Sequence, residues 1–183
     1  KKFFSKKIKV IDCTFDIKSS LKDRIEAIRE EAETAVREGS TCIVLSDKNF
    51  SSEKASIPSI LTVGAVHSHL VKHGLRGYCS LNVECSDAMD THSFAILIGV
   101  GATTVNPYLA IDSIYQRFEK KLFGKSDFET CVSKFKKSID AGLLKIMSKM
   151  GISVISSYRG GCNFEAVGLS RAIVSDYFPG MSS

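Results

Sequence analysis

The fold of this chain is set by residues 42–98, which read CIVLSDKNFSSEKASIPSILTVGAVHSHLVKHGLRGYCSLNVECSDAMDTHSFAILI. Two short runs within it, residues 42–45 and 79–85, have the length and apolar content of buried strands. Each is followed by an apolar helical segment, the first beginning at Pro58 and the second at Asp90. Strands that alternate with helices along a chain lie parallel to one another in a single sheet.

The same alternation continues on both sides of this stretch. Residues 8–15 alternate apolar and polar as a strand does, and residues 21–37 form an amphipathic helix that Gly39 ends. On the other side we expect a short strand at 103–106, helices at 109–123 and 128–150, a final strand at 153–156 and a helix from Asn163. Repeated β-α units predict an α/β fold with a mainly parallel sheet. Five units fall short of the eight in a closed barrel, so the fold is expected to be partial-barrel-like.

The composition is that of an ordinary globular protein, with 183 residues of which 44% are hydrophobic and 25% charged. No run approaches the ~18 apolar residues that a membrane helix needs, so we expect no membrane partner. The net charge of +5 arises from lysines clustered in residues 1–9 and 120–149. Because the lysines of the second cluster alternate with apolar residues, they indicate the solvent-exposed face of a helix rather than a nucleic-acid surface.

Six cysteines occur without any C-x-x-C pair, at positions 13, 42, 79, 85, 131 and 162. A chain of this length does not need disulfides for stability, and several of these thiols stand in apolar runs. We therefore predict free thiols in a reducing, cytosol-like compartment.

Three histidines of one predicted helix are candidate ligands of a metal ion. His67 and His69 are two residues apart and face roughly opposite sides of a helix, so they cannot share an ion. His69 and His73 are four apart and face one side, but the sequence indicates no third ligand. We interpret them as surface or hydrogen-bonded histidines, and we predict no metal site.

The Tyr-Arg-Gly-Gly turn at residues 158–161 follows a predicted strand and precedes a predicted helix, an arrangement that can hold a phosphate. A plain strand-to-helix turn explains it as well. Residues 99–104 (GVGATT) follow a helix and precede a strand, so they stop a helix rather than form a nucleotide loop. No cysteine or serine has a base at a recognisable spacing, and we predict no catalytic and no cofactor-binding residue.

Four stretches, taken in order, resemble glutamate synthase, the flavin and iron–sulfur enzyme that makes glutamate from glutamine and 2-oxoglutarate. They are IPSILTVGAVHSHL at 57–70, GVGATTVNPYLA at 99–110, GLLKIMSKMGIS at 142–153 and SYRGGCNFEAVGL at 157–169. Two positions depart from the family pattern: Ser68 stands where relatives carry a third histidine, and residues 160–165 read GGCNFE instead of GAQIFE.

The resemblance implies that this is a piece of a longer oxidoreductase and that both ends are cuts. In that family a glutaminase domain is followed by a central domain, an FMN-binding barrel and a β-helix. Residues 1–150 would be the C-terminal part of the central domain, and residues 151–183 the segment connecting toward the FMN-binding domain. The piece would be an inactive scaffold that spaces the glutaminase and FMN sites and contributes wall to the ammonia tunnel. FMN and a 3Fe-4S cluster are implied for the parent enzyme, with no cofactor in this fragment.

The same resemblance implies the other domains of the same chain as partners, together with a small NAD(P)H-oxidising subunit. It implies a cytoplasmic location, or a plastid one for a plant or alga, and it leaves the electron donor open among NADPH, NADH and ferredoxin. Interface or tunnel candidates are His67, His69, Asn106, Met147, Ser148, Lys149, Tyr158 and Arg159.

Two further function classes stay open at this point. One is a stand-alone α/β half-barrel binding module that holds an anion or phosphate at Arg159-Gly160-Gly161; the other is a nucleic-acid binder that uses the lysines. For a domain of the parent enzyme we expect an exposed apolar patch within residues 147–178. Its apolar residues would be Phe164, Val167, Leu169, Ile173, Val174 and Phe178.

Overall fold

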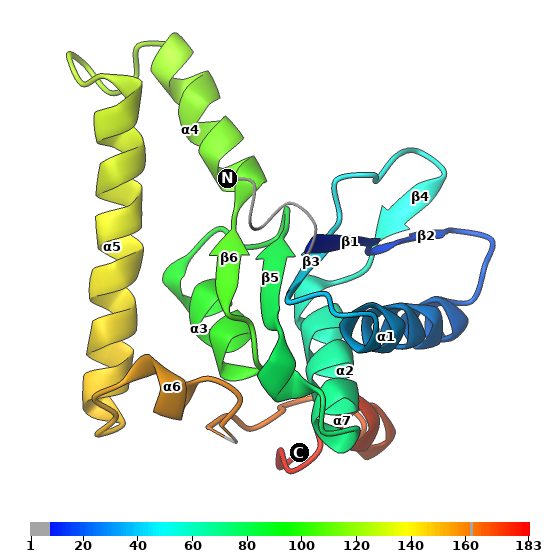
Figure 1. The fold of residues 1–183 in the computed structure, drawn as a ribbon. Coiled ribbons are helices and arrows are strands. Elements are labelled where there is room, and N and C mark those ends of the chain that lie inside the picture. Colours follow the sequence, from blue (N-terminus) through cyan, green and yellow to red (C-terminus); the bar gives the residue numbers. More distant parts are fainter. Residues whose placement is uncertain (1–7, 162) are drawn as a thin grey trace.

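The computed structural model describes residues 8–161 and 163–183, and a parallel four-stranded sheet is at its centre (Figure 1). The sheet order is β1 (Ile8–Asp12), β3 (Cys42–Ser46), β5 (Ser80–Glu84) and β6 (Thr104–Asn106), which is also the order along the chain. Right-handed crossovers between strands in this order place the connecting helices on one face of the sheet, as in part of a barrel. The predicted α/β fold class is confirmed.

Three helices connect these strands: α1 (Leu21–Arg37), α2 (Ser59–Lys72) and α3 (Thr91–Gly99). Side chains of Ser20 and Asp90 cap α1 and α3 by accepting hydrogen bonds from backbone N–H groups of the first turn. The main core lies between the helices and one face of the sheet, where Ile43, Leu45 and Leu81 are at most 1% exposed. On the other face Val10 is 57% exposed, so that face is partly open.

The predicted strand 8–15 is divided in two. After β1 the chain passes the buried Cys13 and leaves the sheet as β2 (Thr14–Asp16). This strand pairs antiparallel with β4 (Lys54–Ser56), a strand that the sequence did not indicate. A short 3-10 helix, η1 (Arg76–Tyr78), precedes β5.

A helical arm follows β6, made of α4 (Tyr108–Glu119) and α5 (Phe128–Lys149). Figure 1 shows α4 leading away from the sheet and α5 returning beside it to pack against α3. The ring of Tyr115 meets the ring of Phe128 edge-on, with centroids 5.4 Å apart, and holds the two helices together near their turn. The two helices predicted for this region are confirmed, although α4 ends four residues before Phe123.

Two predictions for the C-terminal segment are wrong. Residues 153–156 form no strand; Val154 is extended, and α6 (Ile155–Tyr158) begins directly after it. No helix starts at Asn163, because the chain is irregular until α7 (Arg171–Tyr177). The β-branched pair at 154–155 favours a strand locally. The chain forms α6 there instead, and Tyr158 at its end is 0% exposed and donates a hydrogen bond from its hydroxyl to the Ala95 carbonyl at 3.0 Å.

The C-terminal segment is packed onto α2 and α3 through two aromatic rings. Phe178 lies against Gly64 and Phe164 lies against Gly99, so closely that a methyl group on either glycine would overlap the ring. The expected apolar patch is therefore only partly formed. Val174 and Phe178 are buried, whereas Val167 is 90% exposed and Leu169 and Ile173 are also exposed.

The five cysteines of the described residues are free thiols: Cys13, Cys42, Cys79, Cys85 and Cys131. Burial raises the pKa of Cys13 and of Cys85 to about 12, so both are inert small hydrophobes at neutral pH. The sixth, Cys162, and the lysines at positions 1, 2, 6 and 7 lie outside the described residues.

Candidate functional site

A cleft of about 540 Å³ lies between α2, the glycine turn at 160–161 and α7. His67 and Ser68 line it from α2, and Asp176 and Phe178 line it from the C-terminal segment. Parts of the chain that are about 100 residues apart therefore meet here. Of the residues singled out in the sequence, His67, His69, Gly160 and Gly161 line this cleft.

His67 is the central side chain of this region. Arg76 donates from Nε to His67 Nδ1 at 3.1 Å, and the same guanidinium donates to the carbonyls of Cys79 and Gly101 at 2.7 and 2.8 Å. Burial, followed by the positive charges of Arg76 and Arg159, lowers the pKa of His67 to about 4. His67 is therefore neutral at pH 7, with Nδ1 accepting and the proton on Nε2.

Two glycines, Gly101 and Gly160, provide the space that the His67 ring occupies. A methyl group on Gly101 would overlap the His67 ring, and one on Gly160 would stand 2.9 Å from His67 Nε2. Both glycines have positive φ, +123° and +70°. The neutral His67 imidazole therefore packs between two glycines and against Arg76, and it is not present as the imidazolium that would act as a general acid at neutral pH.

His67 and Arg76 stand at the amino edge of the sheet, beside Cys79 and Thr103, which precede β5 and β6. The catalytic edge of parallel α/β folds is the opposite one, at the carboxyl ends of the strands. The location of His67 therefore favours a structural role.

Polar side chains do occupy that opposite edge, at register-matched positions of all four strands: Asp12, Ser46, Glu84 and Asn106. They are hydrogen-bonded among themselves and to their neighbours. Glu84 accepts from Lys48 at 2.7 Å, from Ser46 at 2.9 Å and from Asn106 at 3.2 Å. The hydrogen bond from Lys48 is the largest of the effects that hold the pKa of Glu84 below its ordinary value. The polar side chains at this edge therefore satisfy their hydrogen bonds with one another and with their neighbours.

The structure brings some of the predicted site residues together and separates others. Arg159 lies near His67, whereas Asn106 is at the far edge of the sheet. Met147, 5% exposed, packs with Ala95 and Tyr158 in a second small core, so Met147 and Tyr158 are structural. Ser148 and Lys149 are exposed at the end of α5.

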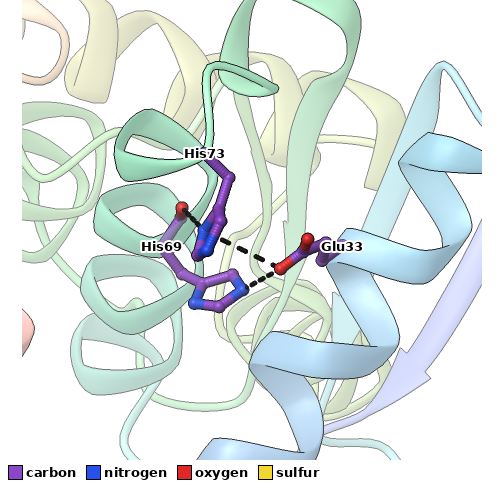
Figure 2. Close-up of side chains that lie close together, drawn as sticks. All are labelled: Glu33, His69 and His73. Atoms are coloured by element: carbon purple, nitrogen blue, oxygen red, sulfur yellow. Dashed lines mark hydrogen bonds and ion pairs between the residues drawn. The ribbon is translucent and has the colours of Figure 1, made fainter.

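His69 lies on another side of α2 and faces α1, where its Nε2 is 2.6 Å from Glu33 Oε2 (Figure 2). His73 lies beside it, with ring centroids 4.3 Å apart. The separation of His67 from His69 that the helical spacing predicts is confirmed.

Three charged residues of these sites were missed from the sequence: Arg29, Glu33 and Arg76. Arg29 is 7% exposed, donates to the Asp176 carbonyl at 3.0 Å and lies over the Tyr177 ring at 4.8 Å. Its position next to Ile28 and four residues after Ile25 places it on the apolar side of α1, and that placement was the signal that could have found it. Glu33 and Arg76 carry no such signal.

The chain is thus an α/β domain with a parallel sheet, a helical arm and a C-terminal segment packed onto its helices. A family model described as the glutamate synthase central domain matches residues 1–170, and the chain belongs to this family. The resemblance noted in the sequence is confirmed.

The relatives agree with this assignment. The chain is 54% identical to the glutamate synthase (NADPH) large chain of Azospirillum brasilense over 176 residues, which cover 94% of this chain and 12% of that protein. It is 44% identical to the glutamate synthase (NADPH) large chain of Bacillus subtilis, covering 94% of this chain and 11% of the relative. It is 41% identical to the chloroplastic ferredoxin-dependent glutamate synthase of Spinacia oleracea, covering 97% and 12%. The chain thus spans about one eighth of the length of these relatives.

The stand-alone anion-binding module is not supported. Residues 159–161 follow the short helix α6 instead of a strand, and the described residues after them begin no helix before Arg171. The helix N-terminus that would have held the anion is therefore missing from this turn. None of the helices in the described ranges is long and apolar enough to cross a membrane.

Proposed function

We propose that this chain is a scaffold within a glutamate synthase large chain and that it is inactive by itself. The parent reaction is the conversion of glutamine, 2-oxoglutarate and reductant into two glutamates, and the parent is an oxidoreductase. The observation that carries the proposal is the fastening of the C-terminal segment, through Phe178 on Gly64 and Phe164 on Gly99. Contacts this close fix the position of the C-terminal segment relative to the sheet.

Two further observations support a scaffold. The carboxyl edge of the sheet is closed by its own hydrogen bonds, as described for Glu84. Parallel sheets are normally covered on both faces, yet Val10 on the second face is 57% exposed. We propose that other domains of the parent chain cover this face and the exposed side chains of Val154, Val167 and Leu169.

The division of the chain follows the same proposal. Residues 1–150 would belong to the central domain, and residues 151–183 would lead toward the FMN-binding domain. His67, His69, Asn106, Ser148, Lys149 and Arg159 are proposed as interface or tunnel positions of the parent, with Met147 and Tyr158 supporting them from the core. The parent would work in the cytoplasm, or in a plastid of a plant or alga, with a small NAD(P)H-oxidising subunit as a further partner.

The cofactors of the parent would be held elsewhere. FMN and a 3Fe-4S cluster are implied for glutamate synthases, but the residues that the structure describes do not fit either group. The one group of three metal-ligating side chains in the described ranges contains no cysteine, and the turn at 159–161 lacks the helix N-terminus that a phosphate would need.

The test is a substitution in the full-length parent enzyme. Phe178→Ala should loosen the C-terminal segment and lower glutamine-dependent glutamate synthesis, while glutaminase activity and ammonia-dependent synthesis stay near their original rates. Phe123→Ala, at a half-exposed phenylalanine of the α4–α5 turn, is the matched control and should change none of the three rates. An equal loss of all three activities with Phe178→Ala, or no loss in any, would contradict a scaffold that couples the two sites.

A further inference from the structure

Glu33 on α1, together with His69 and His73 at the end of α2, forms a cluster beside the cleft described above, which His69 also lines (Figure 2). Their ligand atoms all lie within 4.8 Å of one another. Glu33 Oε2 is 2.6 Å from His69 Nε2 and 3.7 Å from His73 Nδ1. The side chains are between 18% and 34% exposed, so an ion from solution can reach them.

We propose that this cluster is a site for a divalent transition-metal ion of the Zn²⁺ type. Two imidazoles and one carboxylate, with water in the remaining position, are a known donor set for Zn²⁺ in proteins. His69 and His73 are four residues apart, so one helical turn presents both rings on one side. Glu33 is the third donor that the sequence did not indicate, and it comes from the neighbouring helix.

The carboxylate is already oriented for this role. Arg37, one turn further along α1, donates to Glu33 Oε1 at 2.8 Å from Nε and leaves Oε2 facing the histidines. The other oxygen, Oε2, lies 2.6 Å from His69 Nε2. An ionised carboxylate with one oxygen held by a second residue is the arrangement that metal sites favour.

The histidine rings are also held. His73 Nδ1 lies 2.8 Å from the His69 carbonyl, a hydrogen bond that fixes the ring when that nitrogen carries the proton and leaves Nε2 as the ligand atom. Around an ion with bonds of about 2.0–2.1 Å in tetrahedral geometry, donor atoms stand about 3.3 Å apart. The 2.6 Å pair of Glu33 Oε2 and His69 Nε2 must therefore open slightly, which partly exposed side chains can do by small rotations.

A bound ion would link α1 to α2 near the end of α2, and it would replace the single hydrogen bond between Glu33 and His69 with three coordinate bonds. Because the ion would bind the folded chain and not the separated helices, it would stabilise the fold. The proposal does not depend on the proposed scaffold function, since it concerns these three residues alone.

The test uses the 183-residue chain, freed of metal by a chelator and then titrated with Zn²⁺ by calorimetry. We expect one Zn²⁺ per chain, and a rise in the Tm of about 3 °C or more at ~100-fold excess over the Kd. Glu33→Gln and His73→Ala should each weaken binding at least tenfold. His92→Ala removes an exposed histidine outside the cluster and should leave binding unchanged.

Cobalt distinguishes the cluster from the cysteines. Co²⁺ bound by nitrogen and oxygen donors gives weak visible bands, whereas thiolate ligands add an intense sulfur-to-metal charge-transfer band. The proposal is overturned if the chain binds no Zn²⁺ at one per chain, if binding survives both cluster substitutions, or if the cobalt spectrum shows thiolate ligands. Circular dichroism of each variant separates a lost ligand from a lost fold.

Discussion

His67 and His69 are two residues apart on one helix, and their surroundings differ in sign. Burial lowers the pKa of His67, and the nearby positive charges of Arg76 and Arg159 act in the same direction. His69 faces the carboxylate of Glu33 at 2.6 Å. The same side chain, on the same helix, is therefore neutral on one face and lies against an anion on the other. The difference comes from the neighbouring segments and not from α2 itself.

The largest effect is expected from filling the space beside His67. Gly101→Ala places a methyl group in the ring of His67, at a φ of +123° that side chains rarely adopt. We expect a loss of about 3 kcal/mol or more in the free energy of unfolding, measured by urea denaturation. Gly39→Ala is the matched control, because Gly39 has a φ of +93° and open space around it. A loss at Gly101 no larger than that at Gly39 would show that the His67 contact contributes nothing.

An intermediate effect is expected from pH on the His67 face. The pKa of His67 falls from an ordinary 6.5 to about 4 in the folded chain, so the unfolded chain binds the proton first. Stability from this residue is complete above pH 6.5 and is lost as the pH falls from 6.5 toward 4. We expect a loss of about 2 kcal/mol across this window after allowing for partial exposure. His67→Gln should remove that loss, and the difference between the two denaturation series measures it; equal series would place His67 in an unperturbed environment.

The smallest effect is expected on the opposite face. Without metal, Glu33→Gln removes the ion pair with the exposed Arg37 and weakens the hydrogen bond with His69, and an ion pair near the surface contributes little to stability. The Tm at pH 7 should fall less than with either substitution on the His67 side. A larger fall would mean that the contact between α1 and α2 depends on this carboxylate. Glu30→Gln, at an exposed glutamate one turn earlier on α1, is the control.

The sequence was sufficient where structure depends on local pattern. The apolar runs at 42–45 and 79–85 became adjacent parallel strands, and the apolar segment after Pro58 became the buried helix α2. It failed at residues 153–156 and 163–170. A β-branched pair favours a strand locally, but this part of the chain forms α6, which places Tyr158 in a buried position against Ala95. No local sequence pattern predicts that Tyr158 will donate to the carbonyl of Ala95, which is 63 residues away.

The α/β class, the family and the placement of His67 and His69 on different sides of one helix could be predicted from the amino-acid sequence, because helical and strand periods repeat within a few residues. The residues that each histidine contacts could be identified only in the folded chain. Arg159 is 92 residues from His67, and Glu33 is 36 residues from His69. Pairings over such distances depend on how α1 and the C-terminal segment pack against α2, and packing is a property of the whole folded chain.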